Sequence, residues 1–225
     1  MKALVHTKVL KMEYKDVPKP TINDDNVIIK IKSVGICGSD IHGYTGASGR
    51  RIPPLVMGHE ASGTIVEVNC NSKFKVGQNV TFDSTIYCGN CEYCKTGLVN
   101  LCSHRRVLGV SCDEYMQDGA MAEYLSLPER IVYRLDDKIN LDDAALIEPA
   151  SVAYHSISLS EIKTNGTVLI LGAGVIGLII IQALRIKGCN NIIVADKDEK
   201  RLNIAKFYGA KTTFNTIEKD SINEL

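Results

Sequence analysis

The 225-residue chain lacks an excess of charge of either sign, because 26 Lys and Arg residues balance 26 Asp and Glu residues. It also lacks any long run of like charge. A neutral chain has no general electrostatic attraction for nucleic acid or for an anionic membrane surface. We therefore expect no nucleic-acid partner and no membrane partner, and a function that depends on local groups of residues.

The chain also has few long hydrophobic runs. Residues 1–7 lack the apolar core of a secretion signal. The most apolar stretch, from Val168 to Leu184, is interrupted by three glycines and Gln182. It falls short of the ~20 residues that a membrane-spanning helix needs. A buried strand followed by a buried helix explains it better, and we expect a cytoplasmic protein.

Short strands dominate the first 150 residues. Alternating or β-branched segments occur at 27–32, 64–68 and 79–82, and Gly and Asn residues lie between them, as turns require. Many short strands at close spacing indicate a barrel-like fold. We therefore predict a β-rich first domain over residues 1–150.

Strands and helices alternate beyond Leu141, where a short helix is expected over 141–147. Three strands and two helices follow in turn, at 167–171, 175–187, 191–195, 198–208 and 211–214. This order predicts a parallel, doubly wound sheet in a second domain over residues 151–225. Such a sheet has about six strands and only three are visible, so we expect a truncated domain from a longer protein.

Four of the eight cysteines are clustered with the spacing C-x2-C-x2-C-x7-C. These are Cys88, Cys91, Cys94 and Cys102. Four thiolates complete a tetrahedral shell around zinc and leave no open position, which is typical of a structural site. An iron–sulfur cluster uses similar spacing and remains an alternative, as do four unrelated thiols. The other cysteines are expected to be small buried hydrophobic residues: Cys70, Cys112 and Cys189.

A second set of metal-ligating side chains is spread over two segments. Cys37 and His42 lie in the first, His59 and Glu60 lie in the second, and a Pro53-Pro54 turn separates them. Mixed sulfur, nitrogen and oxygen ligation suits zinc, and three protein ligands leave room for water or substrate. Each residue alone is more often packed or hydrogen-bonded, so this hypothesis depends on the rest of the chain.

A G-x-G-x-x-G motif lies between the first strand and the first helix of the second domain. Its glycines are Gly172, Gly174 and Gly177, and Val175 and Ile176 lie between the last two. The glycines allow the tight turn, the approach of a pyrophosphate and the packing of helix on strand. The helix N-terminus offers free N–H groups to phosphate. The motif predicts a dinucleotide site.

Asp196 ends the next strand, 19 positions after Gly177. A carboxylate there accepts hydrogen bonds from both ribose hydroxyls of NAD and repels the extra phosphate of NADP. Arg201 and Lys197 lie nearby and weaken that repulsion. NAD is therefore the expected cofactor.

In combination, these motifs resemble the zinc-containing medium-chain dehydrogenases, and most closely the branch of sorbitol and galactitol-1-phosphate dehydrogenases. The resemblance covers essentially the whole chain and includes Glu148-Pro149. It implies a GroES-like β-barrel catalytic domain, a Rossmann NAD-binding domain and two zinc ions per chain. It also implies a homo-oligomer, dimer or tetramer, for the full-length form.

The resemblance further implies roles for the first zinc segment. Cys37, His59 and either Glu60 or Glu148 would hold the catalytic zinc, and Asp40 would orient His59. Ser39 would take the alcohol proton and pass it outward through His42. A helix cap is the alternative role for Ser39.

The expected reaction is hydride transfer between a secondary alcohol or polyol and NAD. The substrate could be a polyol phosphate that pairs with Arg50 or Arg51, although two solvated surface arginines are the simpler interpretation. Three alternatives stay open: a quinone reductase of the same fold, a zinc-binding interaction or nucleic-acid module, and an inactive fragment of the enzyme.

Overall fold

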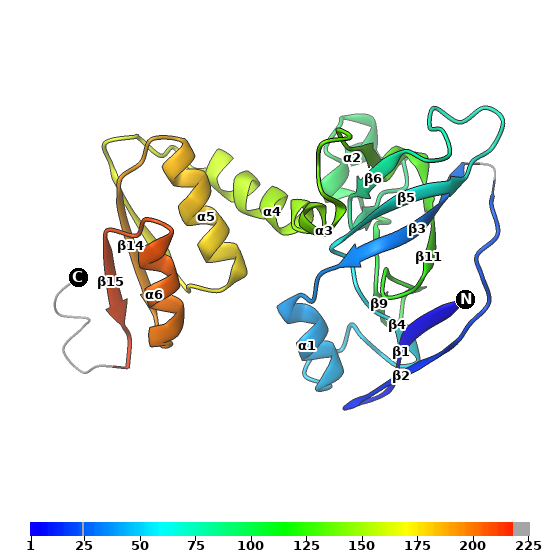
Figure 1. Cartoon of the computed structure of the whole chain (residues 1–225), viewed down its shortest axis with the longest axis horizontal. Coiled ribbons are helices and arrows are strands. Elements are labelled where there is room, and N and C mark those ends of the chain that lie inside the picture. Colours follow the sequence, from blue (N-terminus) through cyan, green and yellow to red (C-terminus); the bar gives the residue numbers. More distant parts are fainter. Residues whose placement is uncertain (24, 218–225) are drawn as a thin grey trace. The chain divides into compact units, whose positions relative to one another are not determined.

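The computed structural model describes residues 1–23 and 25–217 and divides into two compact units (Figure 1). The first unit is Met1–Glu148, and the second begins at Pro149. The division falls two residues before the domain boundary expected from the sequence. Each unit has its own buried apolar cluster.

An antiparallel five-stranded sheet forms the framework of the first unit, in the order β11-β3-β5-β6-β12. Buried residues such as Ile29, Ile65 and Leu127 make its core. Strands were expected at 27–32, 64–68 and 79–82, and all three are confirmed with small differences at their ends. The five strands are β3 (Asn26–Val34), β5 (Ala61–Glu67), β6 (Asn79–Phe82), β11 (Tyr124–Pro128) and β12 (Val132–Arg134).

Short strands and helices complete this first unit. One small sheet has the order β2-β1-β4, and two further pairs are β7-β8 and β9-β10. The strands are β1 (Lys2–Lys8), β2 (Lys11–Asp16), β4 (Leu55–Val56), β7 (Thr85–Ile86), β8 (Arg106–Val107), β9 (Val110–Ser111) and β10 (Met116–Gln117). The short helices are α1 (Gly38–Tyr44), α2 (Glu92–Lys95), η1 (Val99–Leu101) and η2 (Glu129–Ile131).

Two helices occupy the region where one short helix was expected over 141–147. The first, α3 (Leu141–Ala144), begins after Asn140, whose side-chain oxygen accepts the Asp142 N–H at 2.9 Å. The second, α4 (Ile147–Ser158), was not foreseen. Pro149 lies in its first turn, where the missing proline N–H costs no helical hydrogen bond. A proline therefore marks the start of α4 rather than a break.

The second unit contains a parallel sheet in the order β13-β14-β15. Two helices connect the strands and cover the same face of the sheet, as successive right-handed crossovers require (Figure 1). The alternating arrangement expected from the sequence is confirmed. Its elements are β13 (Thr167–Leu171), α5 (Val175–Ile186), β14 (Asn191–Asp196), α6 (Glu199–Phe207) and β15 (Thr212–Asn215).

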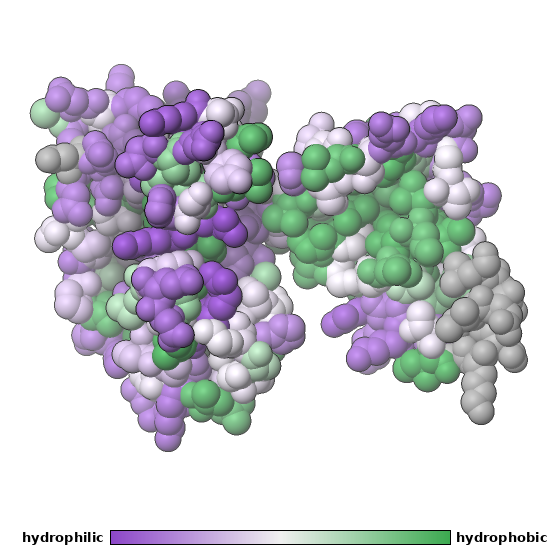
Figure 2. All heavy atoms as spheres, turned by 180° about the vertical axis from the view of Figure 1, so that it is seen from behind, coloured by the Kyte–Doolittle hydropathy of each residue, from purple (hydrophilic) through white to green (hydrophobic). Residues whose placement is uncertain are grey.

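The apolar stretch from Val168 to Leu184 is divided between β13 and α5. Among the described residues, no helix combines the length and the apolar character needed to cross a membrane. Apolar side chains also lie on the surface of the second unit (Figure 2). Leu169 and Leu171 of β13 are exposed, because alternate residues of this strand point away from its buried Ile170.

Candidate functional site

Three predicted zinc ligands lie close together in the first unit. Cys37 is the residue before α1, and His59 and Glu60 directly precede β5. One ligand atom from each of these residues lies within 4.8 Å of the other two. His59 and Glu60 are each 7% exposed. A sulfur, a nitrogen and an oxygen donor in a buried corner fit zinc with one position left open.

Two glycines shape the backbone around this corner. The Gly35 N–H donates to the Glu60 carbonyl at 2.7 Å, and a Cβ at Gly35 would collide with the Glu60 carboxylate. Gly58 has φ +94°, a conformation that L side chains rarely adopt. Both positions therefore require glycine for His59 and Glu60 to face Cys37.

Asp40 lies directly behind His59 and is only 2% exposed. Its Oδ2 accepts the Cys37 backbone N–H at 3.1 Å, and its Oδ1 lies 3.6 Å from His59 Nδ1. This leaves the other imidazole nitrogen, Nε2, for the cluster with Cys37. A carboxylate behind the imidazole is the usual way to orient a metal-ligating histidine. The placement fits the orienting role that the resemblance implies for Asp40.

Charges at this corner change the proton affinities of both donors. The hydrogen bond to His59 lowers the pKa of the Cys37 thiol. Burial works to lower the pKa of His59, but the hydrogen bond to Cys37 and the charge of Asp40 outweigh it and raise that pKa. A metal ion bound here would displace the protons of both side chains, since ligands bind in their deprotonated forms.

Glu148 lies outside the three-residue cluster, although its charge acts on His59. The Ser84 hydroxyl donates to Glu148 Oε1 at 2.8 Å. Burial raises the pKa of Glu148, and the hydrogen bond from Ser84 opposes this effect. The sequence left the choice between two glutamates open, and the structure places Glu60 with Cys37 and His59.

Ser39 and His42 lie one turn apart on α1, with Ser39 half-buried and His42 exposed. Residues three apart on a helix face the same side, which is the arrangement that a relay requires. The residue that caps α1 is Cys37. The alternative role of Ser39 as the cap is therefore wrong. Its hydroxyl oxygen instead accepts a hydrogen bond from Arg51 at 3.1 Å.

The four clustered cysteines surround one point, with all four sulfur atoms within 4.8 Å of one another. Contacts between sulfur atoms measure 3.5, 3.8 and 3.9 Å. Thiolates about 2.3 Å from a tetrahedral zinc stand about 3.8 Å from each other. The set therefore fits a single tetrahedral ion, and it is too tight for a multi-iron cluster. Four unrelated thiols are excluded by the same distances.

Backbone N–H groups support this cysteine cluster. The Cys88 N–H donates to Cys102 Sγ at 3.3 Å, and the Cys91 N–H donates to Cys88 Sγ at 3.4 Å. Hydrogen bonds from the backbone of Cys94 and Ser103 lower the pKa of the Cys91 thiol to about 6. At neutral pH Cys91 therefore already favours the thiolate, the form that binds zinc, whereas burial raises the pKa of the Cys94 thiol to about 12.

The remaining cysteines follow the expectation only in part. Cys189 is buried in the core of the second unit. Cys70 is exposed and Cys112 is intermediate, so the expectation of burial is wrong for Cys70. Cys70 lies in a turn after the end of β5.

The glycine motif forms the turn between β13 and α5. Gly172 has φ +102°, and a Cβ at Gly177 would collide with the Gly172 carbonyl oxygen. Gly174 precedes the first residue of α5 and has no side chain to cap the helix. The first turn of α5 contains no acidic residue. Its N–H groups and the helix dipole are therefore available to a phosphate group. Val175 and Ile176, which begin this helix, are exposed.

Asp196 ties this turn to the end of β14. Its Oδ2 accepts the Ala173 N–H at 2.6 Å, and its Oδ1 accepts the Asp198 N–H at 2.9 Å. Burial works to raise the pKa of Asp196, but these two hydrogen bonds outweigh it and lower that pKa. The sequence indicated a ribose ligand and missed this second task. Each carboxylate oxygen has two acceptor sites, so Asp196 can perform both.

Arg201 lies on α6 with an exposed side chain. Its Nε is 3.9 Å from Asp198 Oδ2, and its charge also lowers the pKa of Asp196. Arg201 therefore lies beside the predicted ribose site, as the sequence suggested.

The two arginines considered for a substrate phosphate have different environments. Arg50 is exposed, and a hydrogen bond with Tyr115 raises the pKa of its guanidinium. Arg51 is 7% exposed, and its guanidinium contacts Ser39 and Asp40. The interpretation as a solvated surface arginine is therefore wrong for Arg51 and fits Arg50, and contact with a substrate phosphate stays a prediction.

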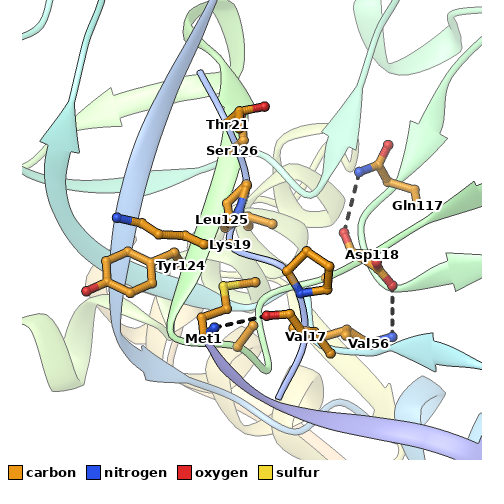
Figure 3. Close-up of a pocket in the computed structure, with 14 residues that line it drawn as sticks. Met1, Val17, Lys19, Thr21, Val56, Gln117, Asp118, Tyr124, Leu125 and Ser126 are labelled. Carbon is orange, nitrogen blue, oxygen red and sulfur yellow. Dashed lines mark hydrogen bonds between the residues drawn. The ribbon is translucent and has the colours of Figure 1, made fainter. Parts of the chain in front are cut away.

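A groove of about 470 Å³ lies elsewhere on the first unit (Figure 3). It is lined by the N-terminal segment and β11, and the Met1 amino group donates to the Val17 carbonyl at 2.9 Å. Asp118 Oδ1 accepts the Val56 N–H at 3.0 Å on its other side. None of the predicted site residues lines this groove.

Comparison with known families accounts for this combination of fold and donor sets. The alcohol dehydrogenase GroES-like domain matches residues 23–137, about half of the chain. The chain belongs to the zinc-containing medium-chain dehydrogenase family. The GroES-like and Rossmann assignments made from the sequence are thereby confirmed.

Individual relatives resemble the whole chain. Sorbitol dehydrogenase of Bacillus subtilis is 37% identical over 229 residues, which span 100% of this chain and 64% of that protein. Galactitol-1-phosphate dehydrogenase of Escherichia coli superposes with a TM-score of 0.89 at 31% identity, over 96% of this chain and 62% of that one. An Escherichia coli alcohol dehydrogenase complexed with NADH superposes with a TM-score of 0.89 at 34% identity, over 100% of this chain and 64% of that one. The chain thus spans slightly less than two thirds of these relatives.

Proposed function

We propose that this chain carries the zinc and nucleotide sites of an enzyme that transfers a hydride between a secondary alcohol or polyol and NAD. The observation that carries the proposal is the buried cluster of Cys37, His59 and Glu60, backed by Asp40. The names of the sorbitol and galactitol-1-phosphate dehydrogenases support a polyol, free or phosphorylated, as substrate.

In this proposal Cys37, His59 and Glu60 hold the catalytic zinc. A zinc ion bound there would polarise the alcohol oxygen and lower the pKa of the hydroxyl. Ser39 would accept the alcohol proton while it releases its own proton toward His42, the exposed residue one helical turn away. Glu148 would stay nearby as a second carboxylate, held by Ser84.

The four-cysteine cluster would hold a second, structural zinc, because its four donors leave no position for substrate. In the second unit, the glycine turn and the start of α5 would bind the pyrophosphate of the dinucleotide. Asp196 would accept the ribose hydroxyls, which favours NAD over NADP. Arg201 is positioned to moderate that preference.

Two features argue against the other functions. The reaction of a quinone reductase of this fold does not require the Cys37 cluster, and an interaction module does not require the glycine motif that follows β13. Among the described residues every cysteine is free, which is typical of a reducing compartment and supports the cytoplasm as the location. A homo-oligomer of the full-length form stays a prediction.

Metal content per chain, with an alcohol-oxidation assay, tests the proposal. Both are measured on the full-length gene product and on the 225-residue chain. Two zinc ions per chain and NAD reduction with polyols are expected for the full-length product. Activity of the longer product alone would identify the 225-residue chain as an inactive part. One zinc ion, lost only when Cys88–Cys102 are mutated, would contradict the catalytic site.

A further inference from the structure

Arg51 is a buried cation beside the corner formed by Cys37, His59 and Glu60, and the only role that the sequence suggested for it was contact with a substrate phosphate. Its side chain is 7% exposed. The stem passes directly against Gly43 on the buried side of α1, where a Cβ at Gly43 would collide with Arg51 Cβ and Cγ. The backbone of Arg51 forms a bridge with Ser111 of β9. A glycine in the helix thus provides the space that this arginine occupies.

The Arg51 guanidinium faces two residues of the first turn of α1. One terminal nitrogen donates to Ser39 Oγ at 3.1 Å, and Nε lies 3.8 Å from Asp40 Oδ1. The same Asp40 oxygen lies 3.6 Å from His59 Nδ1. Within the described part of the chain, these three buried atoms, Arg51 Nε, Asp40 Oδ1 and His59 Nδ1, have no hydrogen bond within normal distance. Both nitrogen atoms face the same Asp40 oxygen, and a small approach of Arg51 and His59 toward it would form both hydrogen bonds.

We propose that Arg51 is a positioning residue that fixes two groups at once, the Asp40 carboxylate behind His59 and the hydroxyl of Ser39. Through Asp40 it keeps the imidazole aligned for the metal. Through Ser39 it occupies one acceptor site of the hydroxyl oxygen, which leaves the other for the substrate hydroxyl and directs the O–H outward. The second part rests on the proposed dehydrogenase function, whereas the first concerns metal binding alone.

Both contacts require the planar fork of an arginine. Guanidinium offers several donors in fixed directions, whereas a lysine ammonium is a point charge on a flexible stem. Lysine at position 51 would restore the charge beside Asp40 without the directed donor to Ser39. The two parts of the proposal are therefore separable by a single conservative substitution.

The test compares Arg51→Ala, Arg51→Lys and Gly43→Ala in the zinc-loaded full-length protein. Arg134→Ala is the control, because Arg134 is an exposed arginine of the same unit with no proposed role in the site. The first readout is the rate of zinc transfer to a chromogenic chelator, in the phase that a His59→Ala variant lacks. The second is kcat and KM for a polyol that the unchanged protein oxidises. Thermal unfolding of each variant identifies the ones that are folded.

Arg51→Ala is expected to release this zinc about 10–100-fold faster and to lower kcat by a similar factor, because partners behind metal ligands have effects of this size. Arg51→Lys should release zinc as slowly as the unchanged protein, but its kcat should be as low as that of Arg51→Ala. Gly43→Ala, which displaces the arginine stem without changing any charge, should resemble Arg51→Ala even though alanine favours the helix. This third variant keeps the test valid if Arg51→Ala does not fold.

Zinc release and kcat in folded Arg51→Ala or Gly43→Ala within twofold of the Arg134→Ala control would overturn the proposal. Fast zinc release from Arg51→Ala in a protein that oxidises no polyol would support the role toward Asp40 and His59 while contradicting the proposed function. If both the unchanged protein and Arg51→Ala released zinc slowly and oxidised the polyol normally, the proposed function would be supported and the role of Arg51 contradicted.

Discussion

Ser84 donates a 2.8 Å hydrogen bond to Glu148, and this carboxylate stays outside the cluster of Cys37, His59 and Glu60. The two glutamates are therefore not equivalent, although both were candidates as zinc ligands. One is part of the cluster, and the other is held by a serine that precedes β7.

Glu60→Gln should remove the catalytic zinc, whereas Glu148→Gln should retain it. The amide is a weaker ligand than a carboxylate, but at position 148 it still accepts the hydrogen bond from Ser84. Zinc content per chain, measured after dialysis, checks this difference. Equal loss of zinc in both variants would indicate that the two carboxylates share the ion.

Cys102→Ser should release the structural zinc and destabilise the first unit. Cys102 is buried, and its sulfur is one of four donors that leave no position for a replacement ligand. Structural zinc supplies folding free energy directly, so we expect a loss of several kcal/mol or more in denaturant unfolding. Cys70→Ser is the control, because Cys70 is exposed and lies outside the cluster. A stable, zinc-loaded Cys102→Ser chain would be inconsistent with this assignment.

Gly177→Ala should weaken dinucleotide binding. The added methyl group would collide with the Gly172 carbonyl and push α5 away from the glycine turn. A loss of 10-fold or more in affinity, about 1.4 kcal/mol or more, is expected. Fluorescence titration with NADH measures it. Gly174→Ala is the comparison, since a Cβ there meets no atom within 4 Å in the described structure. Any loss of NADH affinity in Gly174→Ala would therefore come from contact between the added methyl group and the dinucleotide.

Asp196→Asn should reduce stability at neutral pH by about 1 kcal/mol, since one backbone N–H of the Ala173 and Asp198 pair loses a charged acceptor. The folded-state pKa of Asp196 lies below its ordinary value of 3.8. Its contribution is therefore present above pH 4 and is lost as the pH falls through the folded pKa. Unfolding curves measured from pH 7 downward should show the difference between the variant and the unchanged chain begin to shrink below pH 4. A constant difference across this range would exclude the linkage.

Asp196→Ser should also shift the cofactor preference from NAD toward NADP. Removal of the carboxylate abolishes the repulsion of a 2′-phosphate, and the positive charge of Arg201, which acts on Asp196, would then favour that phosphate. The ratio of kcat/KM for the two cofactors measures the change. No change in that ratio would show that Asp196 serves the glycine turn alone.

The amino-acid sequence by itself determined the features whose parts lie close together along the chain. The cysteines from Cys88 to Cys102 and the glycines from Gly172 to Gly177 each belong to one short segment, so their spacing already fixes which groups can meet. The alternation of elements from β13 to β15 followed from hydrophobic pattern for the same reason.

Only the tertiary structure decided how side chains from distant segments are combined. It placed Glu60 in the zinc cluster, set Ser84 against Glu148 and buried Arg51 under α1. Sequence spacing carries no information about such pairings, because the direction of each side chain is set by the packing of its whole element. For Arg51, that direction depends on the absence of a single Cβ at Gly43, and this placed the cation behind the catalytic corner instead of in solvent.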